Sequence, residues 1–188
     1  MLPALSERAS RRRSLDERLR VRFPSVFRVL SEAGLRVSPH TRLRRLVLRR
    51  ALVRVYAAAN RRDFDLIRTT QDPERYEYRP SDDLRPLDLD PVFHGHEGYL
   101  RLWGYWLDAF ADIRWEPQEM LDLGDRMLVT ARQQGHGSGS GVAVGEHVFQ
   151  LFTFRRGLVI RQEDFSDRAK ALEAAGVPGR DAGEVLHE

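Results

Sequence analysis

The chain has 188 residues, enough for one domain with a sizeable core and an appended segment. It has no cysteine, which excludes disulfides and thiolate metal sites, and no apolar run approaches the roughly 20 residues that cross a bilayer. Residues 1–50 carry a net charge of +10, whereas residues 51–188 carry −7. We therefore expect a soluble, cytoplasmic protein with a basic N-terminal segment.

The arginines of that segment are a weak indication of a nucleic-acid partner. Of the 31 basic residues only Lys170 is a lysine, a bias that codon composition produces without selection for binding. No aromatic stacking motif or recognised nucleic-acid module accompanies the charge. We therefore expect no nucleic-acid binding.

Residues 1–40 are predicted to form a basic, partly helical extension. Ser14 and Glu17 have the spacing of a capping box, in which a serine and a glutamate three residues later bond the first free N–H groups of a helix. Pro24 limits or restarts that helix, and Gly34 is a natural stop. The segment also contains four apolar residues that need a cover: Phe23, Val26, Phe27 and Leu30.

Two covers are possible for this apolar set. The extension can dock on the main domain, closing its mouth or lengthening a dimer contact, or it can lie on a membrane surface. Arginine is interspersed along the segment and is not confined to one polar face. We therefore expect docking and no membrane partner.

The main domain is predicted to span residues 41–176. A helix capped by Thr41 or Ser38 runs to about Asn60, and its apolar residues share one face: Leu48, Leu52, Val55, Tyr56 and Ala59. A short helix at 64–69, a strand at 76–79 and a proline-rich loop at 80–91 follow. The next helix opens at His94–Gly98.

That helix carries an aromatic stripe at helical spacing, formed by Tyr99, Trp103, Trp106 and Phe110. Its expected role is to fill the concavity of a curved sheet. Lining an apolar ligand cavity is the second interpretation, and the two are compatible.

Four extended segments joined by three short connections, and then a short helix, end the domain. Gly124-Asp125, the glycine-serine run 135–141 and Arg156-Gly157 separate the strands at 115–123 and 126–136 from two further strands, which a short helix follows. Strands joined this closely pair antiparallel. The glycine-serine run is no phosphate loop, because strands flank it and it contains no lysine. Residues 177–188 are expected to be a disordered tail.

The stretch from Leu43 to Gly176 resembles the SnoaL-like group of the nuclear transport factor 2-like superfamily. The resemblance rests on YAAANRRDFD, FHGHEGYLRLW, DLGDRMLV, GHGSGSGV and FRRGLVIRQEDFSDRAKALEAAG. It implies an α+β fold in which a conical, curved antiparallel sheet wraps around a long helix. It does not imply one activity, because the superfamily includes isomerases, cyclases, epoxide hydrolases and proteins without catalysis.

The limonene epoxide hydrolases of this superfamily are similar in strand order. Their motifs align Arg132 with an arginine, Asp164 with the water-activating aspartate and Tyr78 with a tyrosine that holds the water. Gln134 departs from an acid-donating aspartate and Pro80 from an asparagine. Since epoxide opening needs an acid as well as a base, these departures disfavour that reaction.

Ketosteroid-isomerase and polyketide-cyclase relatives use a carboxylate base with a donor for an enolate, so Asp164 with Tyr78 or a histidine can serve. Alternation along the strand at 126–136 puts Thr130, Arg132, Gln134 and His136 on one face. We expect a ligand to contact Tyr99, Trp103, Trp106, Gln134, His136, His147 and Gln162. His94 and His96 lack a third ligand at a defined spacing, so neither a metal nor a cofactor is expected.

The expected function is binding of a small, mainly apolar organic molecule in a conical pocket. Acid–base chemistry with Asp164 as base is one hypothesis, and a non-catalytic ligand-binding or dimerisation module is the other. A homodimer is predicted because the strand containing Phe149, Leu151, Phe152 and Phe154 is apolar on both faces.

Overall fold

Short-range signals set the ends of the helices in the computed structural model, which describes residues 13–39, 41–82, 85, 89–177, 179 and 184–185. Thr41 Oγ1 accepts a hydrogen bond from the Arg44 N–H, and α4 (Arg42–Arg61) begins there. The Ser14 N–H donates to Glu17 Oε2 at 2.8 Å, half of the predicted capping box, at the start of α2 (Leu15–Arg22). The other helices are α3 (Pro24–Arg36), α5 (Phe64–Arg68), α6 (Gly95–Ala109) and α7 (Arg168–Ala174).

The strands form one seven-stranded sheet in the order β2-β1-β6-β5-β4-β3-β7. The central strands β3 (Arg114–Asp122), β4 (Arg126–His136), β5 (Ala143–Arg155) and β6 (Leu158–Phe165) pair antiparallel with their neighbours, as predicted. β1 (Glu77–Pro80) is parallel to β6, and the two-residue strands β2 (Phe93–His94) and β7 (Glu184–Val185) form the edges of the sheet. The sheet is curved and open, so the predicted α+β fold is confirmed.

Two details differ from the sequence-based expectations. Gly34 does not stop α3, which continues for two more residues to Arg36. Most of the tail at 178–188 lies outside the described residues, but Glu184–Val185 pairs with β3, in contrast to the expected disorder. Part of the loop at 80–91 also lies outside the described residues.

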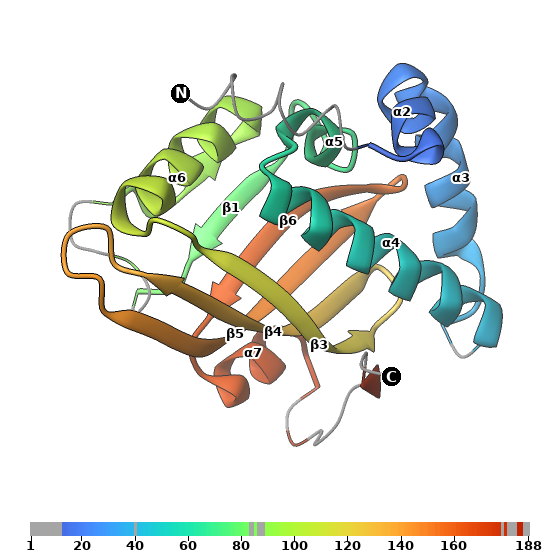
Figure 1. The fold of residues 1–188 in the computed structure, drawn as a ribbon. Coiled ribbons are helices and arrows are strands. Elements are labelled where there is room, and N and C mark those ends of the chain that lie inside the picture. The colour runs from blue at the N-terminus through green and yellow to red at the C-terminus, as the bar shows by residue number, and fades with distance from the viewer. Residues whose placement is uncertain are drawn as a thin grey trace.

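Helices cover both faces of the sheet (Figure 1). On the concave face α4, α5 and α6 pack with β1 and the central strands around the main apolar core, which includes Tyr56, Phe64, Trp103 and Val129. On the other face α7 covers a smaller cluster of Leu128, Phe149, Leu151, Ala171, Leu172 and Ala175. The concave side is therefore where a cavity can form.

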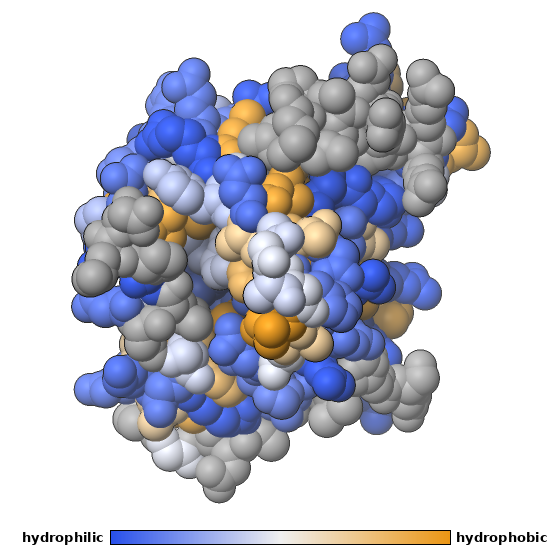
Figure 2. Space-filling view, turned by 60° about the vertical axis from the view of Figure 1, so that its left-hand side comes forward, coloured by the Kyte–Doolittle hydropathy of each residue, from blue (hydrophilic) through white to orange (hydrophobic). Residues whose placement is uncertain are grey.

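The second cluster bears on the predicted homodimer. Phe149 and Leu151 were expected to need cover on the convex face, and α7 of the same chain supplies it. The homodimer stays a prediction, but β5 no longer requires it. On the face turned forward in Figure 2, apolar residues form separate patches between hydrophilic ones.

The N-terminal extension contacts the main domain through ion pairs, backbone groups and Val21, which packs on the main core, whereas Phe23, Val26 and Leu30 of the predicted apolar set stay exposed. Arg13 pairs with the fully buried Asp63, and Arg61 pairs with Glu17 at 2.9 Å. Beside them, α3 converges on the start of α4 (Figure 1) and passes over the β5–β6 turn, where Gly157 adjoins the backbone of Arg28 and Glu32. No described helix is both long and apolar enough to cross a membrane.

Gly157→Ala is expected to loosen α3 from the sheet. A Cβ at this position would lie 2.5 Å from the Arg28 carbonyl oxygen and 2.6 Å from the Glu32 nitrogen, and the residue has a φ of +79°. Gly124→Ala is the matched control, because Gly124 has a φ of +91° and its nearest neighbour is Pro39 Cγ at 3.9 Å. Backbone strain destabilises both variants by an amount of order 1–3 kcal/mol. Only in Gly157→Ala does the added Cβ also clash with the backbone of α3.

Urea unfolding compares the two variants. We expect Gly157→Ala to lose at least about 1 kcal/mol more than Gly124→Ala, which is the scale of an overpacking penalty. Equal losses would mean that α3 moves away from the turn without cost.

Candidate functional site

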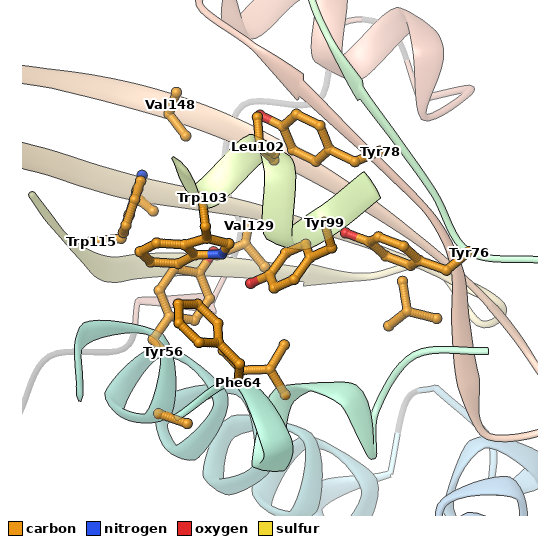
Figure 3. Packing of buried hydrophobic residues seen from close by; sticks show 14 of the residues in the cluster. Tyr56, Phe64, Tyr76, Tyr78, Tyr99, Leu102, Trp103, Trp115, Val129 and Val148 are labelled. Atoms are coloured by element: carbon orange, nitrogen blue, oxygen red, sulfur yellow. The ribbon is translucent and has the colours of Figure 1, made fainter. Parts of the chain in front are cut away.

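The concave face of the sheet and helices α3, α4 and α6 enclose a cavity of about 200 Å³. Its walls are mainly apolar or aromatic and include Leu48, Leu52, Val55, Leu102, Trp103, Trp106, Trp115, Met127 and Phe152. The predicted apolar face of α4 and the aromatic stripe of α6 both contribute, so core filling and cavity lining hold together. Figure 3 shows the aromatic side chains of α4, α5, α6, β1 and β3 turned toward one another.

Asp164 is the carboxyl group in this apolar lining. The residue is 6% exposed, and its side chain accepts three hydrogen bonds from protein groups. Tyr78 Oη donates to Oδ2 at 2.9 Å, Gln150 Nε2 donates to Oδ2 at 2.9 Å, and Gln162 Nε2 donates to Oδ1 at 3.0 Å. A carboxylate has about four lone-pair sites, so one site on Oδ1 remains for a ligand.

Two tyrosines orient the two glutamine amides. Tyr56 Oη donates to Gln150 Oε1, and Tyr76 Oη donates to Gln162 Oε1 at 3.2 Å. Because each glutamine oxygen is occupied by a phenol, each Nε2 must face Asp164. The amide orientation therefore favours the ionised carboxylate.

Burial and hydrogen bonding act in opposite directions on Asp164. Loss of solvent raises the pKa of the carboxyl more than the hydrogen bonds from Gln162, Gln150 and Tyr78 lower it, and the net result is a pKa of about 6. The pKa values of Tyr56, Tyr76 and Tyr78 are raised well above 10, first by burial and also by the charge of Asp164. At neutral pH the site therefore holds a carboxylate surrounded by neutral phenols.

Tyr99 is the cavity phenol with a different partner. The Trp103 side chain hydrogen-bonds to its hydroxyl, and an indole can only donate. Trp103 is the hydrogen-bond partner of the Tyr99 hydroxyl among the described residues. Burial raises the Tyr99 pKa, so this O–H stays available as a donor to a bound molecule.

The structure brings together several of the predicted site residues. Asp164 and Tyr78 are in contact, and Gln162, Tyr99, Trp103 and Trp106 line the same cavity.

Arg132 does not lie beside Asp164, although its alignment with the arginine of the limonene epoxide hydrolases predicted that the two belong to one site. Asp164 pairs with Gln150 and Gln150 with Val129, so these residues share the concave face, and Arg132, three positions from Val129, faces outward. Arg132 is exposed, and the same alternation puts Gln134 and His136 outside. The inward-facing polar residue of this strand is Gln133, which accepts a hydrogen bond from Trp115 Nε1 at 2.8 Å.

The histidines are also outside the cavity lining. His136 is exposed and contacts Asp112 with an Nδ1–Oδ2 distance of 3.0 Å, and His147 Nε2 lies 2.9 Å from Gln118 Oε1. His94 and His96 do not line the cavity either. The described residues contain no group of three or more histidines and acids arranged for a metal ion.

The sequence argument missed Gln150, Tyr56 and Tyr76. A usable signal for Gln150 is its position as a lone amide in the apolar run of β5 from Val148 to Phe152, where a polar group needs a buried partner. Tyr56 was placed on the correct helix face, but nothing in the chain order indicates its contact with β5.

Comparison with known proteins agrees with the fold. The SnoaL-like domain family model matches residues 52–162. TerC, crystallised with polyporic acid, is 22% identical, with a TM-score of 0.57 over 68% of this chain and 95% of that one. An NTF2-like protein from Burkholderia pseudomallei K96243 is 21% identical, with a TM-score of 0.57 over 70% and 98%. No curated protein matches.

A further similar structure is IdmH of Streptomyces antibioticus, a candidate polyketide cyclase. It is 19% identical, with a TM-score of 0.52 over 67% of this chain and 96% of that one. At these identities the solved structures share the fold alone with this chain.

Proposed function

This chain belongs to the SnoaL-like domain family, and from that premise we propose that it binds a small, mainly apolar carbonyl compound and removes a proton beside the carbonyl. The observation that carries the proposal is Asp164, a carboxylate with one free lone-pair site in an apolar cavity. A pKa of about 6 leaves it ionised at neutral pH, yet basic enough to accept a proton.

The proposed step uses two groups of the cavity. The substrate C–H bond breaks, the proton adds to Asp164 Oδ1, and the electron pair stays on the substrate as an enolate. The enolate oxygen accepts a hydrogen bond from the Tyr99 hydroxyl, whose partner Trp103 is itself a donor and leaves the phenol proton for a ligand. Return of the proton to another carbon of the substrate completes an isomerisation. In a cyclisation the enolate carbon bonds to a second carbonyl carbon of the substrate, whose oxygen becomes an alkoxide and takes the proton from Asp164.

The cavity limits the size of the substrate. Its volume of about 200 Å³ is below the roughly 300–1,000 Å³ of typical drug-sized sites. A molecule of one or two rings fits this space. The apolar walls favour hydrocarbon over polar groups, except at Asp164 and Tyr99.

Epoxide hydrolysis is disfavoured by the position of Arg132 and Gln134. Both lie on the outer face of β4, so neither can contact an epoxide held at Asp164. The aligned position of the acid-donating residue is also a glutamine, which cannot supply a proton to the leaving oxygen.

Ligand binding without catalysis is the second candidate. The observation in its favour is that three protein donors already solvate Asp164, as they would in a structural carboxylate. In this case ligands bind and Asp164 takes no proton.

Hydrogen–deuterium exchange separates the two functions without knowledge of the natural substrate. Candidate ligands of one or two rings, including 2-acetylnaphthalene and small polyketide-like esters, are incubated with the protein in D2O, and NMR follows the C–H groups next to each carbonyl. We expect catalysed exchange for at least one compound that also binds. Binding by calorimetry without exchange for any bound carbonyl compound would favour the non-catalytic module.

A further inference from the structure

Arg20 of α2 is a cation in the wall of the cavity without an acidic partner in the described part of the chain. Its Nε donates to Thr69 Oγ1 at 3.1 Å, and its guanidinium lies 5.8 Å from the centre of the Phe27 ring. Burial lowers the Arg20 pKa, and the charge of Arg54 acts in the same direction. A guanidinium in this setting still carries its charge, and an anion beside it would offset both effects.

Gln71 supplies an unsatisfied acceptor in the same wall. The residue is 4% exposed and lines the cavity, and its Oε1 has no hydrogen-bond partner. Its side chain hydrogen-bonds to the Tyr76 hydroxyl. Since that hydroxyl gives its own proton to Gln162, the Gln71 amide must donate, which keeps Oε1 free.

A buried acceptor without a partner costs about 1–3 kcal/mol, so Gln71 needs a donor from a bound molecule. Arg20 needs an acceptor, best a negatively charged one. The two residues together fit a carboxylate with a hydroxyl group next to it.

The position of Arg20 is built into the fold. The Arg13–Asp63 and Arg61–Glu17 pairs hold α2 against the start of α5, and α3 closes the cavity with Ser31, Gly34 and Leu35. Arg20 lies outside residues 52–162, the part that matches the family model. The charged wall is thus contributed by the N-terminal extension and not by the matched domain.

We propose that Arg20 and Gln71 form a subsite for a carboxylate and its neighbouring hydroxyl, so that the carbonyl compound bound in the cavity also carries a hydroxy acid group on its aromatic or alicyclic ring. This inference rests on the proposed function for the apolar cavity and adds the class of its ligand. The acid lies at Arg20 and the reacting carbon at Asp164, and no ion pair joins these two residues in the described structure.

Isothermal titration of the full chain with three bicyclic probes tests the subsite. 2-Naphthoate carries the acid, 2-acetylnaphthalene replaces it by a neutral ketone of similar shape, and 3-hydroxy-2-naphthoate adds the hydroxyl. We expect 2-naphthoate to bind at least about tenfold more tightly than the ketone, as for a hydrogen-bonded charge pair. The hydroxyl is expected to add a further several-fold gain.

Two variants assign the preference to Arg20. Arg20→Met should abolish the tenfold preference for the acid and leave the affinity for the ketone unchanged. Arg22→Met is the matched control, because Arg22 is exposed on the same helix and does not line the cavity. It should keep the full preference.

Each contrary result overturns a defined part. Equal affinities of the wild-type protein for acid and ketone overturn the role of Arg20 and leave the proposed function intact. This result does not depend on whether Arg20→Met folds. Equal affinities for the two acids overturn the role of Gln71. Absence of binding for all three probes overturns both the subsite and the proposed function.

Discussion

Asp164→Asn is expected to slow deuterium exchange on a bound carbonyl compound by roughly 10²–10⁴-fold, the usual contribution of a positioned general base. Asparagine has nearly the same shape but cannot accept the substrate proton. Affinity for the same compound should change by less than about threefold, because the apolar walls stay in place. Exchange by NMR and calorimetric titration on the same samples give both quantities.

The pH dependence of the wild-type rate provides an internal check. The pKa of Asp164 is about 6, so exchange at limiting substrate should rise with pH through this value and level off above about pH 7. A rate that is flat between pH 5 and 8, or equal exchange by Asp164→Asn, would contradict the role of Asp164 as base.

Asp164→Asn is expected to reduce exchange activity without reducing the stability of the fold at pH 8. The folded protein binds the Asp164 proton more tightly than the unfolded chain, because burial raises the pKa from 3.8 to about 6. The contribution of this group to the free energy of unfolding therefore falls as pH rises from about 4 to 6 and is about 3 kcal/mol lower above that range. Asp164→Asn removes this pH dependence, so urea unfolding at pH 8 should show little loss or a gain, and a large loss would indicate a structural role.

Arg44→Met is expected to destabilise the fold by about 3–5 kcal/mol, the range for removing one member of a buried ion pair. Arg44 is 2% exposed, and its Nε lies 2.7 Å from Asp122 Oδ2. Its guanidinium also donates to the carbonyl oxygens of Leu35, Val37 and Gly124. The substitution leaves Asp122 as an unpaired buried charge and frees the segment that links α3 to α4.

Two further variants separate charge from general damage to α4. Arg42→Met removes an exposed arginine of the same helix and should change stability by less than about 0.5 kcal/mol. Arg44→Met/Asp122→Asn should recover part of the loss, because no buried charge then lacks a partner. Urea unfolding of the wild-type protein and the three variants measures all of these effects. A loss under 1 kcal/mol for Arg44→Met would contradict a stabilising role of the buried Arg44–Asp122 pair.

The order and type of the elements follow from the amino-acid sequence with few errors. Helix caps, turn glycines and the spacing of apolar residues are local properties. Thr41 could therefore be predicted as a helix cap, and Gly124 and Gly157 as turn residues, without knowledge of the rest of the chain. The face of α4 that carries Leu52 and Tyr56 follows from helical spacing for the same reason. The partnership of Tyr78 with Asp164 followed from family resemblance, not from spacing.

The faces of β4 and the contribution of α2 were decided only by the tertiary structure. Alternation predicts which residues share a face, but which face turns inward depends on the pairing of β4 with β5 and β6, and this pairing puts Arg132 outside. Arg20 reaches the cavity because α2 docks through ion pairs with residues more than 40 positions away. Such contacts depend on which distant segments meet in the folded chain, and local sequence patterns do not determine this.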